Sequence, residues 1–272
     1  VKDELVDAST PPLPENLTVE QTDYTLGPIE ERTATVVFSA KEEWTLSIVY
    51  DDADADAAWL TADAAGGAAG EQSLGMSAAR NFQAAPRTAY VDLVCGEQTV
   101  RLTVTQTGLS DDMDFSALFD ETFAQKLQER DIISDAEKIT MQEMQSMAIM
   151  TELDISGTYD NPGSLTSLRG IEYFEALTKL NCNRNSLPEL DVSQNTELTE
   201  LRCEYNSLTE LDVSLNTELT VLHCQRNSGD GNSVFPLTVW GDQAEKPGSL
   251  YVYQSGWTYN DKYITIEYQT AE

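Results

Sequence analysis

Leu177-Thr-Lys-Leu-Asn-Cys-Asn-Arg-Asn185, Leu198-Thr-Glu-Leu-Arg-Cys-Glu-Tyr-Asn206 and Leu219-Thr-Val-Leu-His-Cys-Gln-Arg-Asn227 are three copies of one pattern, spaced 21 residues apart. Between them, Leu187-Pro-Glu-Leu-Asp-Val-Ser193 and Leu208-Thr-Glu-Leu-Asp-Val-Ser214 repeat at the same interval. Because a single short unit cannot bury its own apolar face, self-similarity over a full period predicts identical units that stack on one another.

The shared pattern Leu-x-x-Leu-x-Cys-x-x-Asn resembles the leucine-rich repeat, whose strand-plus-turn units bury their leucines by stacking. A degenerate earlier copy covers residues 150–155, with residues 157–163 as an insert and residues 165–174 continuing the coil. We expect four coils, the fourth losing register after Asn227. The short period leaves little room for helices opposite the strands, so loops or single turns are expected there.

The repeated cysteines Cys182, Cys203 and Cys224 occupy an inward position on successive strands, which lie about 4.8 Å apart in a sheet. A zinc site needs four converging ligands, and a disulfide would leave one of the three unpaired. The spacing therefore favours a column of small buried side chains, with a metal or redox role as the alternative. Cys95 lies in the other half of the chain without an evident partner. We predict no metal and no cofactor.

Residues that alternate with the buried positions should line one concave face of the solenoid. Arginine and tyrosine are favoured in recognition surfaces, and this face combines them with amides. A solvated sheet face without a partner is the alternative interpretation. The predicted binding residues are Lys179, Asn181, Arg184, Arg202, Glu204, Tyr205, His223 and Arg226.

The last part of the chain, residues 235–272, is rich in aromatic residues. One interpretation is a hydrophobic cap that protects the last coil of the solenoid. In the other, exposed rings stack on a sugar, with Tyr251, Tyr253 and Trp257 as the candidates.

Residues 17–108 contain short runs of alternating apolar and polar residues, typical of half-buried strands in a β-sandwich. They resemble the BACON family (Bacteroidetes-associated carbohydrate-binding, often N-terminal domain) in Phe38-Ser39-Ala40, Trp59-Leu60, Arg87, Tyr90-Val91-Asp92-Leu93 and Thr103-Val104-Thr105-Gln106. The resemblance implies an immunoglobulin-like fold and an extracytoplasmic setting. We interpret this domain first as a spacer, because no cluster of exposed aromatic residues suggests a sugar site.

The remaining segments complete a multidomain arrangement. Residues 1–16 read as a proline-containing tether and residues 109–149 as a linker with a helical cap, and the repeats extend over residues 150–234. For the two helices of the cap, Asp114 is the expected N-cap residue of the first, and Ser134 with Glu137 forms a capping-box pattern for the second. The run Asp51–Asp56 favours a solvated hairpin tip over a calcium loop, since it lacks the glycine and distal glutamate of such loops.

Charge and motifs limit the function. With 47 acidic and 16 basic residues among 272, the net charge of −31 disfavours nucleic acid and anionic membranes, and no apolar run is long enough to span a bilayer. His223 is the only histidine and no catalytic motif occurs. The sequence thus predicts a monomeric, non-enzymatic binding protein at the cell surface or in the periplasm, with a lipid anchor upstream as one option. It would recognise a protein or a glycan; the alternatives are a structural spacer or adhesin stalk, and a polysaccharide-processing accessory enzyme.

Overall fold

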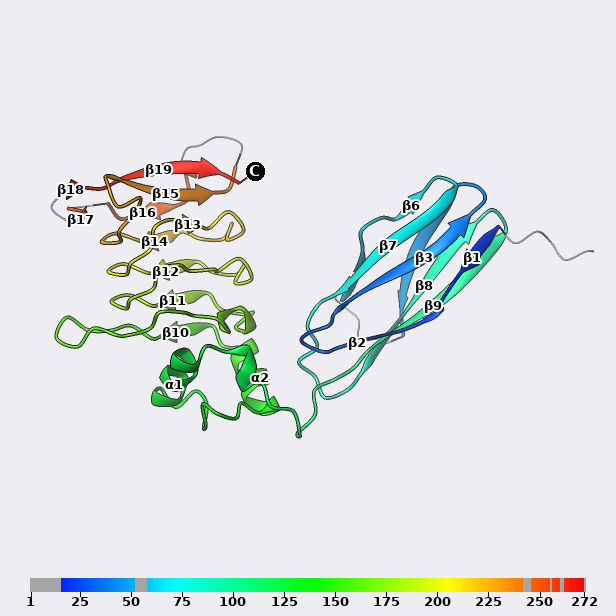
Figure 1. Ribbon diagram of the computed structural model, residues 1–272, viewed down its shortest axis with the longest axis horizontal. Helices are drawn as coiled ribbons and strands as arrows, with labels where there is room; N and C mark the ends of the chain where they lie inside the picture. The colour runs from blue at the N-terminus through cyan, green and yellow to red at the C-terminus, as the bar shows by residue number, and fades with distance from the viewer. Residues whose placement is uncertain (1–15, 52–57, 242–245, 255, 260–261, 272) are drawn as a thin grey trace, which may run out of the picture. The chain divides into compact units, whose positions relative to one another are not determined.

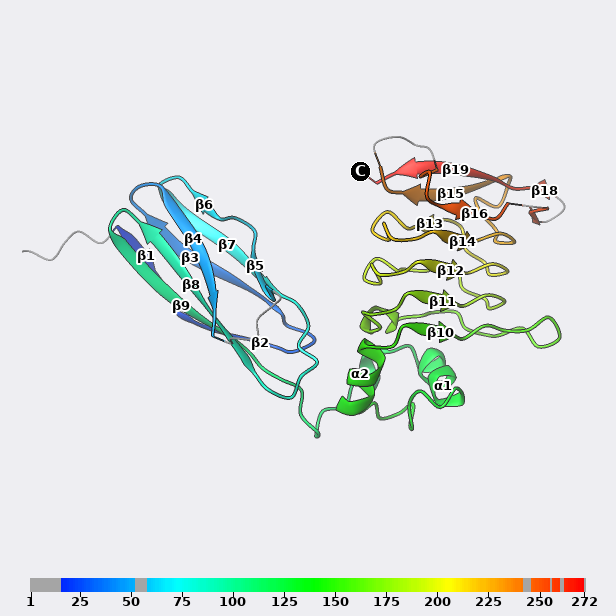
Figure 2. The same ribbon diagram turned by 180° about the vertical axis from the view of Figure 1, so that it is seen from behind.

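The computed structural model describes residues 16–51, 58–241, 246–254, 256–259 and 262–271. The chain divides into two compact units, Val1–Leu109 and Ser110–Glu272. Both are rich in strands, and the described residues contain two α-helices (Figures 1 and 2). Neither is long and apolar enough to cross a membrane. Nearly all of the expected tether and residues 52–56 of the aspartate run lie outside the described residues.

Two β-sheets make up the first unit. One has the order β1 (Leu17–Val19), β3 (Thr33–Ala40), β7 (Gly70–Ala78) and β5 (Leu60–Ala62), and the other β2 (Asp23–Leu26), β9 (Gln98–Gln106), β8 (Arg87–Cys95), β4 (Trp44–Tyr50) and β6 (Gly66–Gly67). Their inward residues alternate along the strands and belong to one buried cluster. In it the rings of Phe38 and Trp44, one from each sheet, meet edge to face at 4.9 Å. The alternating pattern of the sequence therefore fills a core between the two sheets.

The second unit begins with two short helices, α1 (Glu121–Glu129) and α2 (Met141–Ala148), preceded by a 3-10 turn at Ser116–Leu118. The N-cap of α1 is Asp120, whose carboxylate accepts from the backbone of Thr122 and Phe123. The capping box of α2 is formed by Thr140 and Glu143. The predictions of Asp114 and of the pair Ser134 and Glu137 for these positions were wrong.

The reason for both errors is a loop that uses the same side-chain types. The carboxylate of Asp114 accepts from the backbone N–H groups of Ser116 and Ile139, at 2.9 and 3.2 Å. It therefore links two loop segments and does not cap the N-terminus of α1. Ser134 donates its backbone N–H to Glu143, at 2.6 Å. Capping residues in the sequence thus marked this region correctly but not the helix starts.

A five-stranded parallel sheet follows, with one strand above the next in Figure 1. Its order is β10 (Glu152–Asp154), β11 (Lys179–Asn181), β12 (Glu200–Arg202), β14 (Val221–His223) and β16 (Tyr251–Val252). The register pairs Leu180 with Leu201 and Leu201 with Leu222, so equivalent positions of the repeats are neighbours. Four strands were expected; β16 adds a fifth because the segment after Asn227 returns to pair with β14.

Opposite this sheet the chain forms a second parallel sheet, β13 (Leu211–Asp212), β15 (Val234–Val239) and β19 (Thr265–Thr270). A further pair, β17 (Thr258–Tyr259) and β18 (Lys262–Tyr263), is antiparallel. Loops or single turns were expected on this side. The difference arises at the C-terminal end, where β15 and β19 exchange backbone hydrogen bonds along six register pairs and β13 joins them.

Candidate functional site

Side chains that alternate with the buried leucines lie on one face of the parallel sheet, here called the open face. Leu180, Leu201 and Leu222 are at most 1% exposed, so their neighbours along each strand must point the other way. The open face carries two columns across the strands: Glu152, Lys179, Glu200, Val221 and Tyr251 in one, and Asp154, Asn181, Arg202 and His223 in the other.

Buried asparagines hold successive coils in register. The Asn206 amide donates to the carbonyls of Cys182 and Cys203, at 3.1 and 3.0 Å, while its oxygen accepts from the backbone of Leu187 at 3.0 Å. Asn227 repeats these contacts one coil later. Each asparagine satisfies backbone groups that would otherwise be buried without partners, which fixes the position of the strands carrying the open face.

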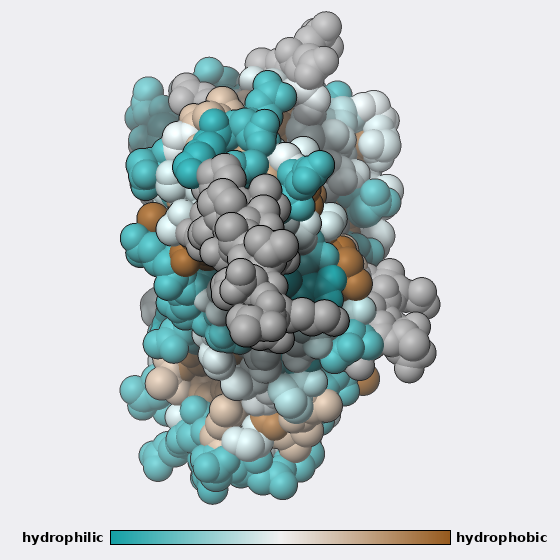
Figure 3. Space-filling model, turned by 90° about the vertical axis from the view of Figure 1, so that its right-hand side faces the viewer, coloured by the Kyte–Doolittle hydropathy of each residue, from teal (hydrophilic) through white to brown (hydrophobic). Residues whose placement is uncertain are grey.

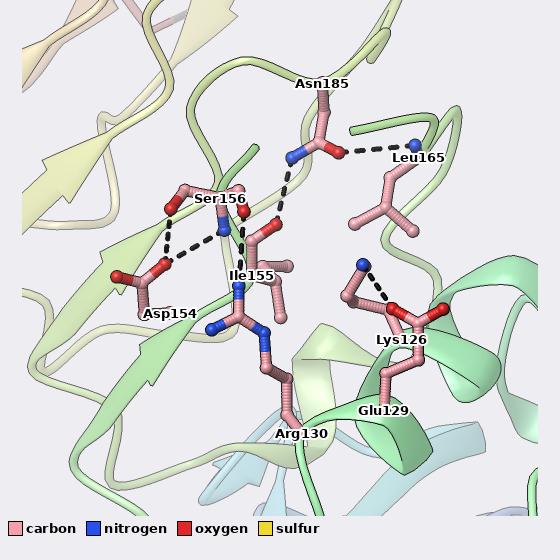
Figure 4. Close-up of polar contacts among 8 residues, drawn as sticks. All are labelled: Lys126, Glu129, Arg130, Asp154, Ile155, Ser156, Leu165 and Asn185. Carbon is pink, nitrogen blue, oxygen red and sulfur yellow. Dashed lines mark hydrogen bonds and ion pairs between the residues drawn. The ribbon is translucent and has the colours of Figure 1, made fainter. Parts of the chain in front are cut away.

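The first coil is fastened to the helical cap by similar contacts (Figure 4). Asn185 donates to the carbonyl of Ile155 and accepts from the backbone of Leu165, so it closes the coil around the insert. Arg130, which ends α1, donates to the carbonyl of Ser156 at 3.2 Å. Burial alone would raise the pKa of Asp154, but hydrogen bonds from Ser156 and Asn181 hold that pKa below its usual range. The edge of the open face nearest the cap is therefore anchored.

The three repeated cysteines form a column behind the open face. Cys182, Cys203 and Cys224 are each 0% exposed, and none of them is in a disulfide. Burial raises the pKa of all three thiols, that of Cys224 to about 12. Since the thiolate is the reactive form, these groups are poor nucleophiles and act as packing. Within the part of the chain that the structure describes, no cluster of three or more His, Cys, Asp or Glu residues is suited to a metal ion.

An arginine–tyrosine ladder, defined as Tyr159, Arg184, Tyr205 and Arg226, runs beside the open face where the strands turn away. The guanidinium of Arg184 lies over the rings of Tyr205 and Tyr159, at 4.1 and 5.6 Å from their centroids. Arg226 lies over Tyr205 at 6.0 Å and donates to the hydroxyl of Thr258 at 3.0 Å. Tyr159 comes from the insert after β10, which extends away from the strands in Figures 1 and 2. Sequence reasoning missed Tyr159, because only the other three share the 21-residue interval.

Several predicted binding residues of the open face pair with acidic residues of the same face. Lys179 reaches Glu152 on the neighbouring strand at 2.6 Å, and Arg202 lies 3.6 Å from Glu200 on its own strand. The Asn181 amide donates to the carboxylate of Asp154 at 3.2 Å. Such half-exposed pairs orient side chains and contribute little to stability.

Glu204 was predicted on the open face, and the structure corrects this. It is only 7% exposed, and its carboxylate accepts from the amide of Asn183 at 3.0 Å. The strand β12 ends at Arg202, so the strict alternation that placed Glu204 outward stops before it. Gln225 is buried at the equivalent position of the next coil.

The aromatic candidates of the C-terminal segment separate into two kinds. Tyr251 is 57% exposed, and Tyr253 stacks on His223 with ring centroids 5.4 Å apart and planes inclined by 12°. Trp257 is only 2% exposed; its indole N–H donates to the carbonyl of Asn227 and its ring packs on Phe235 at 5.0 Å. The prediction that Trp257 stacks on a sugar is therefore wrong, because its ring is buried and covers the last coil.

On the other side of the coils lies a groove of about 1060 Å³ that sequence reasoning did not identify. Carboxylates 21 residues apart line it, namely Glu189 with Glu210 and Asp191 with Asp212. The aspartates accept from the backbone N–H groups of Ser193 and Ser214, so they stabilise turns. The one face drawn in Figure 3 is predominantly hydrophilic, with a few scattered hydrophobic residues.

Comparison with known proteins gives one family match. Residues 16–109 match the family model described as the viral BACON domain. No curated protein matches the chain. Among solved structures, the chain is similar to the functional domain of InlJ from Listeria monocytogenes, described as including a cysteine ladder: the two are 32% identical over 54% of this chain and 30% of that one, with a TM-score of 0.40.

Two further solved structures are more distant. A protein from Bacteroides thetaiotaomicron is 13% identical over 37% of this chain and 95% of its own, with a TM-score of 0.26. A Bacteroides ovatus GH5 xyloglucanase, solved with a XXXG heptasaccharide, is 11% identical over 91% of this chain and 75% of its own, with a TM-score of 0.29. The BACON match accordingly accounts for the first unit, and the InlJ structure is one that this chain resembles in sequence while spanning less than a third of its length.

Proposed function

We propose that the chain is a non-enzymatic, extracytoplasmic binding protein. In this proposal the second unit is a short leucine-rich-repeat solenoid that recognises a protein or a glycan through the open face and the arginine–tyrosine ladder. The first unit is an immunoglobulin-like BACON domain that serves as a spacer between the solenoid and an anchor. BACON domains are typical of extracellular proteins, and the match of the first unit to this family supports an extracytoplasmic setting.

One observation carries the proposal. Arg184, Tyr205 and Arg226 occupy equivalent positions of successive coils, and they remain partly exposed although the asparagines beneath them are buried. A rigid backbone therefore presents two of the three residue types that are enriched at binding hot spots, at a regular spacing. A spacer or stalk without a ligand has no need of such a surface, which makes it the weaker alternative.

A catalytic role has less support. The single histidine, His223, is stacked on Tyr253, and burial keeps the three repeated thiols protonated. Among the described residues, the open-face carboxylates of Glu152, Glu200 and Asp154 are paired with lysine, arginine and asparagine rather than with each other. A polysaccharide-processing enzyme would need a free acid and base facing a sugar.

The proposal is tested by a glycan array and a pull-down from the protein's natural surroundings, both with the full chain. We expect binding that Arg202→Ala and Tyr205→Ala reduce at least about tenfold, a loss of about 1.4 kcal/mol of binding free energy. The matched controls are Arg101→Ala in the first unit and Tyr263→Ala, which is 78% exposed outside the open face. Loss only with Tyr253→Ala would move the site to the C-terminal segment, and hydrolysis of a captured glycan would contradict the non-enzymatic assignment.

A further inference from the structure

The charges of the repeats are segregated. Residues 177–227 contain four basic residues, Lys179, Arg184, Arg202 and Arg226, and all four lie on β11 or β12 or in the turns that follow β11, β12 and β14. Of the eight acidic residues in the same segment, only Glu200 and Glu204 lie there. Within residues 177–227 of a chain with a net charge of −31, the positive charge thus lies on one side of the coils.

Within that face the arginines differ in what they contact. Lys179 and Arg202 each have a carboxylate within ion-pair distance, whereas in the described part of the chain Arg184 and Arg226 have none. The Cζ atoms of both guanidinium groups lie over the Tyr205 ring, and Arg226 also donates one N–H to Thr258, so the remaining N–H groups of the two arginines are left to bind a partner. The ladder is therefore a source of uncompensated donors suited to carboxylates.

The backbone of the ladder adds an independent observation. Arg184, Tyr205 and Arg226 have φ angles of 54°, 57° and 63°, in the left-handed region where glycine or asparagine is favoured. A side chain is disfavoured in this conformation, because its Cβ atom comes too close to the following carbonyl oxygen. All three coils nevertheless carry a large side chain at this position, and such strain is found where side chains serve function.

We propose that the ladder binds the carboxylates of an acidic, extended polypeptide segment of a partner protein. This names the ligand chemistry of the site proposed above and rests on that proposed function. Tyr205 has a guanidinium over its ring at 4.1 Å and a second at 6.0 Å, so its ring is not free for the stacking that sugar recognition uses. A peptide segment needs only the exposed guanidinium edges.

The dimensions of the ladder suit such a segment. Arg184 and Arg226 are two coils apart, which at about 4.8 Å per strand is about 9.6 Å. In a polyproline II segment, side chains three residues apart repeat at about 9.3 Å. Repulsion between the acidic chain and an acidic peptide is screened beyond about 8 Å at physiological ionic strength, so the local contacts decide binding.

The test pans a random displayed library of short peptides on the full chain at physiological ionic strength. We expect the enriched peptides to be rich in Asp and Glu relative to the input library. The double variant Arg184→Gln with Arg226→Gln should lower the affinity of an enriched synthetic peptide at least about tenfold. The control, Lys41→Gln with Lys138→Gln, makes the same change in net charge at exposed residues that do not belong to the ladder and should leave the affinity unchanged.

The outcomes separate this inference from the proposed function. Enrichment of neutral or basic peptides, or peptide affinity that survives the double arginine variant, overturns the inference while the proposed function stands. Binding of heparin or a neutral glycan through the open face, with no acidic peptide enriched, does the same. Both proposals fall if the peptide library, the glycan array and the pull-down all give no binding that the open-face variants reduce.

Discussion

At the residue scale, Asn206 joins two coils with one amide group. It donates to two carbonyls and accepts from one backbone N–H, all buried. Asn206→Ala leaves the buried N–H of Leu187 without a partner and leaves the carbonyls of Cys182 and Cys203 with one donor each, from Asn185 and Asn227. We therefore expect the free energy of unfolding of the second unit to fall by at least about 2 kcal/mol in urea denaturation. Asn161→Ala, at an exposed residue of the insert, is the control and should change it by less than about 0.5 kcal/mol. Equal effects from the two variants would contradict the role of Asn206.

Tyr205 tests whether the ladder serves binding or folding. Glycine relieves the left-handed backbone, worth about 1–2 kcal/mol, but it adds unfolded-state entropy of about 0.5–1 kcal/mol and removes a cation–π contact of similar size. These contributions nearly cancel, so Tyr205→Gly should leave the thermal midpoint of unfolding almost unchanged while it reduces partner binding. A large drop in that midpoint would instead make Tyr205 a structural residue.

Predictions for single residues were confirmed where the 21-residue interval of the repeats by itself determines which side chains are buried. The cysteines repeat with the leucines and are buried with them, as the spacing indicated. Glu204 and Trp257 failed for physical reasons: alternation stops where β12 ends, and aromatic content does not distinguish a ring that covers a core from one that faces water. Tyr159 lies on an insert, and no periodicity could connect it to Arg184.

At the scale of elements, the cysteine column makes the second unit sensitive to high pH. In the unfolded chain the thiols ionise near their ordinary value of 9.0, whereas burial raises their folded pKa, that of Cys224 to about 12. Above pH 9 the unfolded state therefore binds fewer protons than the folded state. A further rise in pH then favours the unfolded state, so the folded state becomes less stable. The free energy of unfolding should fall by up to about 1.4 kcal/mol per pH unit for each thiol as pH rises toward 12.

The control for this pH dependence is the triple variant Cys182→Ala, Cys203→Ala and Cys224→Ala. It is expected to be less stable at neutral pH because of the lost packing, but its stability should fall less steeply between pH 9 and 12. Denaturant titrations at several pH values give both slopes. Identical slopes for the two proteins would show that the thiols do not ionise on unfolding in this range.

The C-terminal segment, residues 235–272, is expected to cap the last coil of the repeats. Trp257→Ala removes a buried ring that packs on Phe235 and donates to Asn227, so we expect a loss of about 3 kcal/mol of stability. Tyr251→Ala, at an exposed ring of the neighbouring strand, should have little effect on stability. Calorimetry of the two variants distinguishes the roles, since comparable destabilisation by both would contradict the assignment of Trp257 as the capping residue.

The element types were more predictable than their boundaries. Strands followed from alternation in the first unit and from the repeat in the second, and the β-rich character of the chain is confirmed. The second sheet was not foreseen, because β13 has two residues and forms only by pairing with β15, which follows it at a distance in sequence. Pairing partners of such short strands are decided by tertiary contacts that local patterns do not contain.

At the scale of the whole molecule, the chain forms two compact units, and the hydrophobic cluster of the first contains no residue of the second. Each should therefore unfold with its own transition in calorimetry. The Asn206→Ala variant should lower only the transition of the second unit, because Asn206 and all of its partners belong to that unit. A single transition that shifts as a whole would contradict independent folding.

Coils 21 residues apart stack in one register and so align the side chains of the open face. The most direct test introduces Asn181→Cys with Arg202→Cys, which are register partners on neighbouring strands. Their separation of about 4.8 Å is within disulfide range, whereas Asn181→Cys with His223→Cys, two strands apart at about 9.6 Å, exceeds it. Under mild oxidation the first pair should crosslink in the native protein and the second should not. Crosslinking of the second pair at the same rate, or none of the first, would contradict the account.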